Sequence, residues 1–195
     1  LGMSLPGSAA IPGADSRRAT LAEQIGRLAV EATRDQRKPS MIMTRNAFEN
    51  AARILLAIGG STNAVIHLAA IAGRLDIELP LSTFDDLSRS TPMILDLKPS
   101  GRYLMEDLFY AGGIPAVIAR LSHLFDLDVS TITGKSLGAN VAGASSFNDD
   151  VIRQLANPIH SEGGLVALNG SLAPGGAVLK QTAASADLLQ HRGRA

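Results

Sequence analysis

Hydrophobic residues recur at helical spacing in three stretches of the first half of the chain. Residues 15–34, 44–56 and 63–72 each place apolar side chains three or four positions apart, which is the period of one face of an α-helix. We therefore predict three amphipathic helices, the second of them capped by Thr44. The positions predicted to be buried are Leu21, Ile25, Leu28, Ala29 and Ala32, then Ala47, Phe48, Ala51, Leu55 and Leu56, and finally Val65, Leu68, Ala69 and Ala72.

The middle of the chain alternates between helical spacing and a short, mostly apolar run. Residues 83–90 predict a short helix, and the run 93–97 is typical of a buried strand in a parallel sheet. Two further helices are predicted, one over residues 102–111 and one from Pro115 to near Leu124. This order of elements indicates a layered α/β arrangement.

The pattern changes after residues 157–158. Residues 163–170 and 175–180 are short apolar stretches bounded by glycines and a proline, which suits an antiparallel or barrel-like β unit. We therefore predict an α/β protein. Residues 1–157 are expected to form the helix-rich part of a layered α/β domain, and residues 158–195 the first strands of a β-barrel-like domain.

Charge and composition exclude several classes of function. The chain has 18 basic and 18 acidic residues, so no cationic surface for nucleic acid or an anionic membrane is expected. It has no run of about twenty apolar residues, so we expect no membrane span and a cytoplasmic location. Cysteine is absent, which excludes disulfides, thiolate catalysis and iron–sulfur ligands from these 195 residues.

The candidate site is the short segment between the second and third predicted helices. Gly59 and Gly60 end one helix, and Ser61 can cap the next. The first turn of that helix is expected to present free N–H groups beside the side chains of Ser61, Thr62 and Asn63, an arrangement that favours a carboxylate or a phosphate. The alternative is that the glycine pair and the serine cap have only a structural role.

Other polar residues are weaker candidates. Glu106 and Asp107 are neighbours on a predicted helix, about 100° apart, so at most one can point into a site, and either can form a local cap or ion pair instead. His67 has no second ligand at metal-binding spacing. The glycines before Lys180 lack the GxxxxGK[ST] order of a phosphate-binding loop. We therefore predict no metal ligand in this chain.

Four segments resemble, in the same order, segments of the dihydroxy-acid and sugar-acid dehydratases, a family that includes 6-phosphogluconate dehydratase. They are LGMSLPGSAAIP at residues 1–12, IGGSTNAVIHLAAIAGR at 58–74, PSGRYLMEDLFYAGGIP at 99–115 and GSLAPGGAVLK at 170–180. The last residues, 181–195, are more similar to the sugar-acid (aldonate) members. The chain is therefore identified as a member of this family, closest to its sugar-acid branch.

The resemblance implies a hydro-lyase that dehydrates a 2,3-dihydroxy carboxylic acid, such as an aldonate, to a 2-keto-3-deoxy acid. It also implies an iron–sulfur cluster that acts as a Lewis acid and a Mg2+ ion that binds the substrate carboxylate. The family motifs for the metal ligands lie mostly upstream of this region and that for the serine base downstream, so neither catalytic residues nor metal ligands are expected here. Ser61, Thr62 and Asn63 are the residues expected to bind the substrate.

Both ends of the chain cut through expected secondary structure, so we interpret it as an internal fragment of a longer enzyme, inactive by itself. The resemblance further implies a C-terminal β-barrel domain that begins within residues 158–195, and a homo-oligomer, either a dimer or a tetramer. Two alternatives stay open. One is a dihydroxy-acid dehydratase of branched-chain amino-acid biosynthesis, and the other is a non-catalytic fragment that binds sugar acids or has a structural, dimerising role.

Overall fold

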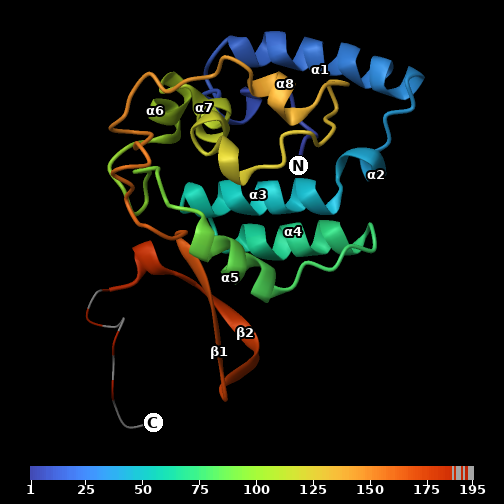
Figure 1. Ribbon diagram of the computed structural model, residues 1–195. Coiled ribbons are helices and arrows are strands. Elements are labelled where there is room, and N and C mark those ends of the chain that lie inside the picture. Colours follow the sequence, from blue (N-terminus) through green and yellow to red (C-terminus); the bar gives the residue numbers. More distant parts are fainter. Residues whose placement is uncertain (186, 188–189, 191, 193–195) are drawn as a thin grey trace.

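The computed structural model describes residues 1–185, 187, 190 and 192, which form helices and one β-hairpin (Figure 1). This mixture of helix and sheet confirms the predicted α/β class, whereas barrel closure and the division near residues 157–158 stay predictions. The elements are α1 (Arg17–Arg34), α2 (Pro39–Ile42), α3 (Arg45–Ala57), α4 (Asn63–Gly73), α5 (Leu81–Ser90), α6 (Met105–Tyr110), α7 (Gly113–Arg120), α8 (Leu137–Val141), β1 (Leu165–Gly170) and β2 (Ala173–Lys180), with short 3-10 helices at Ser8–Ala10, Ser122–Leu124 and Gln181–Ala183.

Helix α3 lies at the centre of the described structure (Figure 1). The N-terminal segment and α7 contact it from one side, and α4 and α5 pack on the other. Phe48, Ala52 and Leu56 are each 0% exposed, as the helical spacing of its apolar positions requires. The predicted cap is confirmed, because Oγ1 of Thr44 accepts a hydrogen bond from the N–H group of Ala47 at 3.4 Å.

Two hydrophobic clusters share α3. The first joins α3 to α4, α5 and the start of β1, and its fully or nearly buried members include Phe48, Leu56, Val65, Phe84 and Leu165. The second joins the C-terminal end of α3 to α6, α7 and the segment before α6, and includes Ala57, Ile94, Leu108, Val117 and Ile152. The position of α3 therefore affects the packing of both clusters.

The segment 93–97 is buried as predicted, but within the described ranges it is not a strand of a parallel sheet. It forms isolated bridges, two antiparallel and one parallel, which join Met93 to His160, Leu95 to Ile152 and Leu97 to Tyr103. A mostly apolar run predicts burial, and a bridged loop segment satisfies that pattern as well as a strand does.

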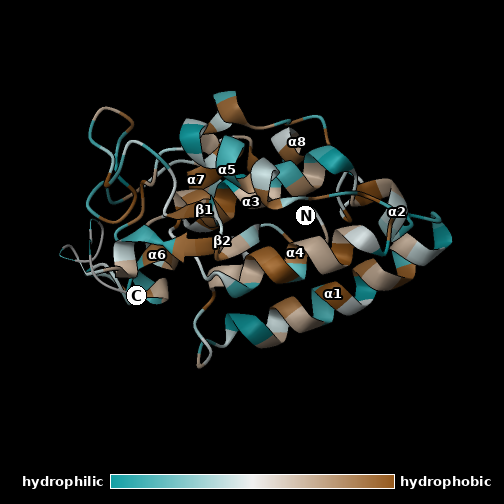
Figure 2. Cartoon of the chain, turned by 90° about the horizontal axis from the view of Figure 1, so that it is seen from below, coloured by the Kyte–Doolittle hydropathy of each residue, from teal (hydrophilic) through white to brown (hydrophobic). Residues whose placement is uncertain are grey.

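Helix α1 forms where it was predicted, but its apolar stripe is mostly uncovered. Ala32 is buried, whereas Ile25 is 46% exposed. Ala29 is also exposed, and Leu21 and Leu28 are half-buried. The predicted burial of the stripe is therefore wrong apart from Ala32, because the part of the chain that the structure describes puts no element over most of α1, which runs along the margin of the molecule (Figure 2).

The N-terminal end of α1 is held by its arginines. The guanidinium carbon of Arg17 lies 4.5 Å from the centre of the Phe109 ring in α6, a cation–π contact. The guanidinium group of Arg18 donates a hydrogen bond to the carbonyl oxygen of Ile11 at 2.7 Å. Although α1 is the longest helix described, neither it nor any other helix of the described residues has the length and apolar character of a membrane span.

The two predicted strands of the last region are confirmed as β1 and β2. They pair antiparallel, with Leu165 opposite Lys180 and Leu168 opposite Ala177. Exposure rises along β1, from 3% at Leu165 to 49% at Leu168, so only the first end of the strand packs on the helices. Figure 1 shows the rest of the hairpin pointing away from the helical part.

A buried asparagine links α3 to the loop after the second 3-10 helix. Asn50 is 7% exposed, and its amide group pairs with both backbone groups of one residue. Its Nδ2 atom donates to the carbonyl oxygen of Asp126 at 2.8 Å, and its Oδ1 atom accepts from the N–H group of Asp126 at 3.0 Å. A buried amide with both partners present stabilises one arrangement of the two segments.

We expect Asn50→Ala to lower the free energy of unfolding by about 2 kcal/mol, because two backbone groups of Asp126 lose their buried partner. The matched control is Asn46→Ala, an exposed residue one turn earlier on the same helix, where only a side-chain contact to Asp126 is lost and a change of about 0.5 kcal/mol is expected. Urea denaturation measures both values. Equal losses in the two variants would show that the backbone pairing of Asn50 does not stabilise the fold.

Candidate functional site

The three predicted binding residues lie in the turn that connects α3 to α4. Ser61 and Asn63 are exposed and Thr62 is half-buried, so their side chains reach the surface. The Oγ atom of Ser61 accepts a hydrogen bond from the N–H group of Asn63, the first residue of α4, at 3.2 Å, whereas Thr62, which directly precedes the helix, makes no side-chain cap bond. The structure therefore places a hydroxyl pair and an amide side by side on one short turn.

The expectation that the first turn of α4 presents free N–H groups is wrong for three of them. The N–H group of Asn63 is bound to Ser61 Oγ, that of Ala64 to the Ser61 carbonyl oxygen at 3.0 Å, and that of Val65 to the Thr62 carbonyl oxygen at 3.1 Å. The helix start is wound tightly enough to satisfy these amides internally. Side-chain groups, rather than backbone amides, are what this turn offers a ligand.

The glycine pair before the turn is packed too closely for side chains. A Cβ atom on Gly59 would lie 2.7 Å from Cε of Met93, and one on Gly60 would lie 2.4 Å from Cδ1 of Leu55. Gly59 also has a φ of +58°, in the left-handed region that residues with a Cβ rarely adopt. The pair thus stops α3 and also lets the chain turn against buried side chains.

A second glycine pair, at the start of the hairpin, packs against the first. A Cβ atom on Gly164 would lie only 2.7 Å from Cα of Gly59, and the N–H group of Gly164 donates to the carbonyl oxygen of Leu56 at 3.1 Å. On Gly163 a Cβ atom would lie 2.6 Å from Oγ of Ser88. Sequence reasoning treated each glycine pair as a local breaker, and the two doublets were the only sign that distant segments meet here.

Helix α5 holds the start of β1 on the side away from β2. Ser88 is 1% exposed, and its Oγ atom donates to the carbonyl oxygen of Leu165 at 2.6 Å. Its own carbonyl oxygen accepts from the N–H group of Gly163 at 2.9 Å. One buried serine therefore fixes two successive points of the hairpin start to α5.

A second residue of α5 contacts the same strand further along. The Oδ1 atom of Asp85 accepts a hydrogen bond from the N–H group of Ala167 at 3.3 Å, and its Oδ2 atom accepts one from Arg89 at 2.7 Å. The hydrogen bond from Arg89, together with that from Ala167, lowers the pKa of Asp85 below its ordinary value of 3.8, although partial burial opposes the shift. The charged carboxylate is thus the form that binds the strand.

The other acidic candidates do not form a metal or catalytic site among the described residues. The Oδ2 atom of Asp107 accepts a hydrogen bond from the N–H group of Leu104 at 2.7 Å, so Asp107 caps its own helix, α6. Glu106 is exposed beside it, and His67 is exposed on α4. Local capping, the structural alternative for this acidic pair, is therefore what the structure shows for Asp107.

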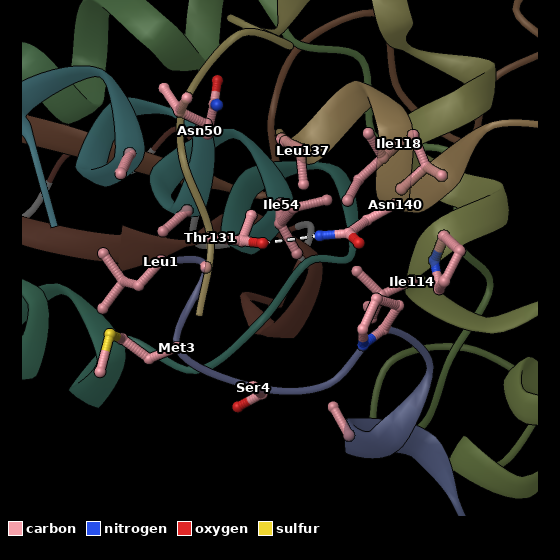
Figure 3. A pocket seen from close by; sticks show the side chains of 18 of the residues that line it. Leu1, Met3, Ser4, Asn50, Ile54, Ile114, Ile118, Thr131, Leu137 and Asn140 are labelled. Carbon is pink, nitrogen blue, oxygen red and sulfur yellow. Dashed lines mark hydrogen bonds between the residues drawn. The ribbon is translucent and has the colours of Figure 1, made fainter. Parts of the chain in front are cut away.

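A cavity of about 460 Å3 lies elsewhere, between the N-terminal segment, α3 and α7 (Figure 3). Three of its polar lining side chains, those of Asn50, Thr131 and Asn140, already have hydrogen-bond partners. The amide of Asn140 donates to Oγ1 of Thr131 at 2.7 Å, and that hydroxyl donates to the carbonyl oxygen of Lys135 at 2.8 Å. The remaining wall is largely apolar and includes Ile54, Ile114, Ile118, Phe125, Val129 and Leu137.

This cavity and the α3–α4 turn differ in what they can bind. The cavity favours an apolar guest, because its buried amides and hydroxyls already have partners and its other contacts are mostly hydrocarbon. An acid with several hydroxyl groups would find few polar partners there, since Ser4 and Ser8 are the only lining hydroxyls to which no side-chain hydrogen bond is made by the described residues. Ser61, Thr62 and Asn63 do not line the cavity. The turn is therefore the better candidate for a polyhydroxy acid.

Comparison with known families assigns the chain. The family profile described as Dihydroxy-acid/6-phosphogluconate dehydratase N-terminal matches residues 1–140. The profile described as Dihydroxy-acid/6-phosphogluconate dehydratase C-terminal matches residues 150–195. The chain belongs to the dihydroxy-acid/6-phosphogluconate dehydratase family, which confirms the resemblance found in its motifs.

Curated relatives match along the whole chain. An L-arabinonate dehydratase of Rhizobium leguminosarum bv. trifolii is 53% identical over 197 residues, and an L-arabonate dehydratase of Azospirillum brasilense is 52% identical over 198 residues. A dihydroxy-acid dehydratase of Methanothrix thermoacetophila is 47% identical over 199 residues. The matches include 100% of this chain but only 34%, 34% and 36% of these relatives, so the chain spans about a third of their length.

The residues at hand do not fit the iron–sulfur cluster or the Mg2+ ion that the resemblance implies. The sequence has no cysteine to bind a cluster iron. In residues 1–185, 187, 190 and 192, no three His, Cys, Asp or Glu side chains are grouped so that they could hold a metal ion.

The contact between Asp85 and the hairpin should depend on pH. Because its pKa is lowered in the folded protein, the carboxylate contributes stability above the ordinary value of 3.8, and this contribution is lost as pH falls through the lowered value. We expect the amide signal of Ala167 to shift with this titration, and the protection of this amide against hydrogen exchange, relative to its intrinsic rate at the same pH, to fall at the acid end. In Asp85→Asn the pH-dependent step should be absent, whereas Asp86→Asn, exposed on the same helix, should keep it.

Proposed function

We propose that the chain is part of a hydro-lyase that removes water from a 2,3-dihydroxy carboxylic acid of the sugar-acid class, such as an aldonate, and yields a 2-keto-3-deoxy acid. The observation that carries the proposal is family membership together with 53% identity, over the full chain, to a relative named L-arabinonate dehydratase. The relative named dihydroxy-acid dehydratase is less similar, at 47%. This difference favours the sugar-acid branch.

The reaction itself sets what the protein must supply. A base takes the proton from the carbon next to the carboxylate, the hydroxyl group on the following carbon leaves as water, and the enol that remains becomes the 2-keto acid. Water must leave from one hydroxyl among several similar ones, so the substrate has to be held in one orientation. Residues that form hydrogen bonds with the other hydroxyl groups provide that orientation.

Ser61, Thr62 and Asn63 are proposed for this orienting role. Two hydroxyls and a carboxamide can each donate and accept hydrogen bonds, which matches the hydroxyl groups of a sugar acid. All three reach the surface from one turn whose own first amides are already satisfied. Since the described residues hold no ligand set for the cluster or Mg2+ implied by the resemblance, we assign no step of the reaction to those groups in this chain.

The runner-up is a dihydroxy-acid dehydratase that acts on branched-chain precursors, and the 47% identical relative supports it. A substrate panel separates the two. The protein, expressed as its gene encodes it, should have a higher kcat/KM for five- or six-carbon aldonates than for a branched 2,3-dihydroxy acid, with the 2-keto product detected as its semicarbazone. The reverse order would replace the proposal by the runner-up. The cytoplasmic location, expected from the composition, and the homo-oligomer, implied by the resemblance, stay predictions.

Replacing Thr62 by Val tests the turn directly, because the change removes a hydroxyl at nearly constant shape. In the same full-length protein we expect KM for the aldonate to rise, or kcat to fall, by about threefold to tenfold, as loss of one uncharged hydrogen bond predicts. Thr20→Val, on the exposed face of α1, is the matched control and should leave both constants unchanged. Wild-type kinetics in Thr62→Val would remove this residue from the site.

A further inference from the structure

We propose that Gly164, at the start of the hairpin, is a positioning residue for the Ser61–Asn63 turn; this inference rests on the proposed function. The two are separated by about a hundred residues in sequence, yet Gly164 packs directly on Gly59, two positions before Ser61. The position of the turn backbone therefore depends on the position of the hairpin backbone.

The contact leaves no room for adjustment at the glycines themselves. A Cβ atom at Gly164 would lie 2.7 Å from Cα of Gly59, whereas ordinary contact is 3.4–4 Å. The obstacle is backbone and not the end of a flexible side chain. An alanine at this position would push the two segments apart by on the order of 1 Å.

The hairpin cannot easily absorb that movement. Its start is fixed to α5 through Ser88, which binds Gly163 and Leu165, and Leu165 is itself 3% exposed within the first cluster. The side chain of Met93, 2% exposed, lies beneath both glycines, with Cε 2.7 Å from a Cβ on Gly59 and Sδ 3.1 Å from one on Gly164. Close-packed surroundings of this kind transmit a displacement instead of damping it.

The turn is the part free to move. Ser61 and Asn63 are exposed, and among the described residues the hydrogen bonds of this turn are local ones within residues 61–65. A shift at Gly59 is thus passed along the backbone to the three side chains proposed to orient the substrate. The turn lies in the range matched by the N-terminal profile and Gly164 in the range matched by the C-terminal one, so binding depends on how the two regions meet.

The kinetic test is Gly164→Ala in the full-length protein as its gene encodes it. We expect KM for the aldonate to rise on the order of tenfold while kcat per folded active site falls much less, because an ångström of misplacement weakens substrate orientation. The control is Gly73→Ala at the end of α4, where a Cβ atom would meet nothing within 4 Å, and it should match the wild type. A purely structural role would lower the folded fraction and leave KM unchanged.

Met93→Leu is the second variant. We expect it to fold even if Gly164→Ala does not. The exchange nearly conserves volume but changes the shape beneath both glycines, so a smaller rise in KM, about threefold, is expected. The inference would be overturned if KM is unchanged in Met93→Leu and Gly164→Ala either also keeps the wild-type KM or does not fold.

A structural measurement separates this inference from the proposed function. The 195 residues contain no cysteine, so nitroxide labels can be placed on Asn63→Cys and on Leu172→Cys at the fully exposed hairpin tip, and the protein without these two substitutions, labelled in parallel, gives the background from any cysteine elsewhere in the full-length protein. Pulsed electron resonance should show the mean label distance displaced in Gly164→Ala, or in Met93→Leu if the first variant unfolds, and unchanged in Gly73→Ala. A displaced distance without any aldonate turnover in the wild type would reject the proposed function alone, and an undisplaced distance would reject the positioning role.

Discussion

The burial of α3 is the constraint on which the rest of the structure depends. One face carries α4 and α5, the opposite face meets the N-terminal segment and α7, and the C-terminal end meets the hairpin. A helix so enclosed must satisfy every polar group it brings inside, and Asn50 does so through both backbone groups of one loop residue. Gly59, just past its C-terminal end, must also lack a side chain, so that the backbone of Gly164 can approach.

Much of this arrangement follows from local pattern in the sequence. The spacing of apolar residues in α3, the cap at Thr44 and the glycine-bounded strands of the hairpin are all local features, and each was predicted correctly. The wrong predictions concern what packs around an element. The stripe on α1 has the same spacing as that on α3, but spacing reports only that a partner is favourable and not that one is present.

The candidate site, too, has features that follow from local sequence and features that do not. That Ser61, Thr62 and Asn63 share one turn follows from their being neighbours, whereas the state of the amides beside them depends on how tightly the helix start is wound. The contact of Gly59 with Gly164 joins segments far apart in the chain, and no periodicity in either segment encodes it. Two glycine doublets flanked by apolar residues are a signal that becomes specific only when the fold shows them touching.

The attachment of α5 to β1 has a consequence for how the sheet can grow. With Ser88 and Asp85 occupying backbone groups along one border of β1, a further strand cannot be added at that border without displacing them. Extension is therefore directed to the border formed by β2, whether the incoming strand belongs to the same polypeptide or to another molecule. Two helix side chains thus give the sheet a single direction of growth.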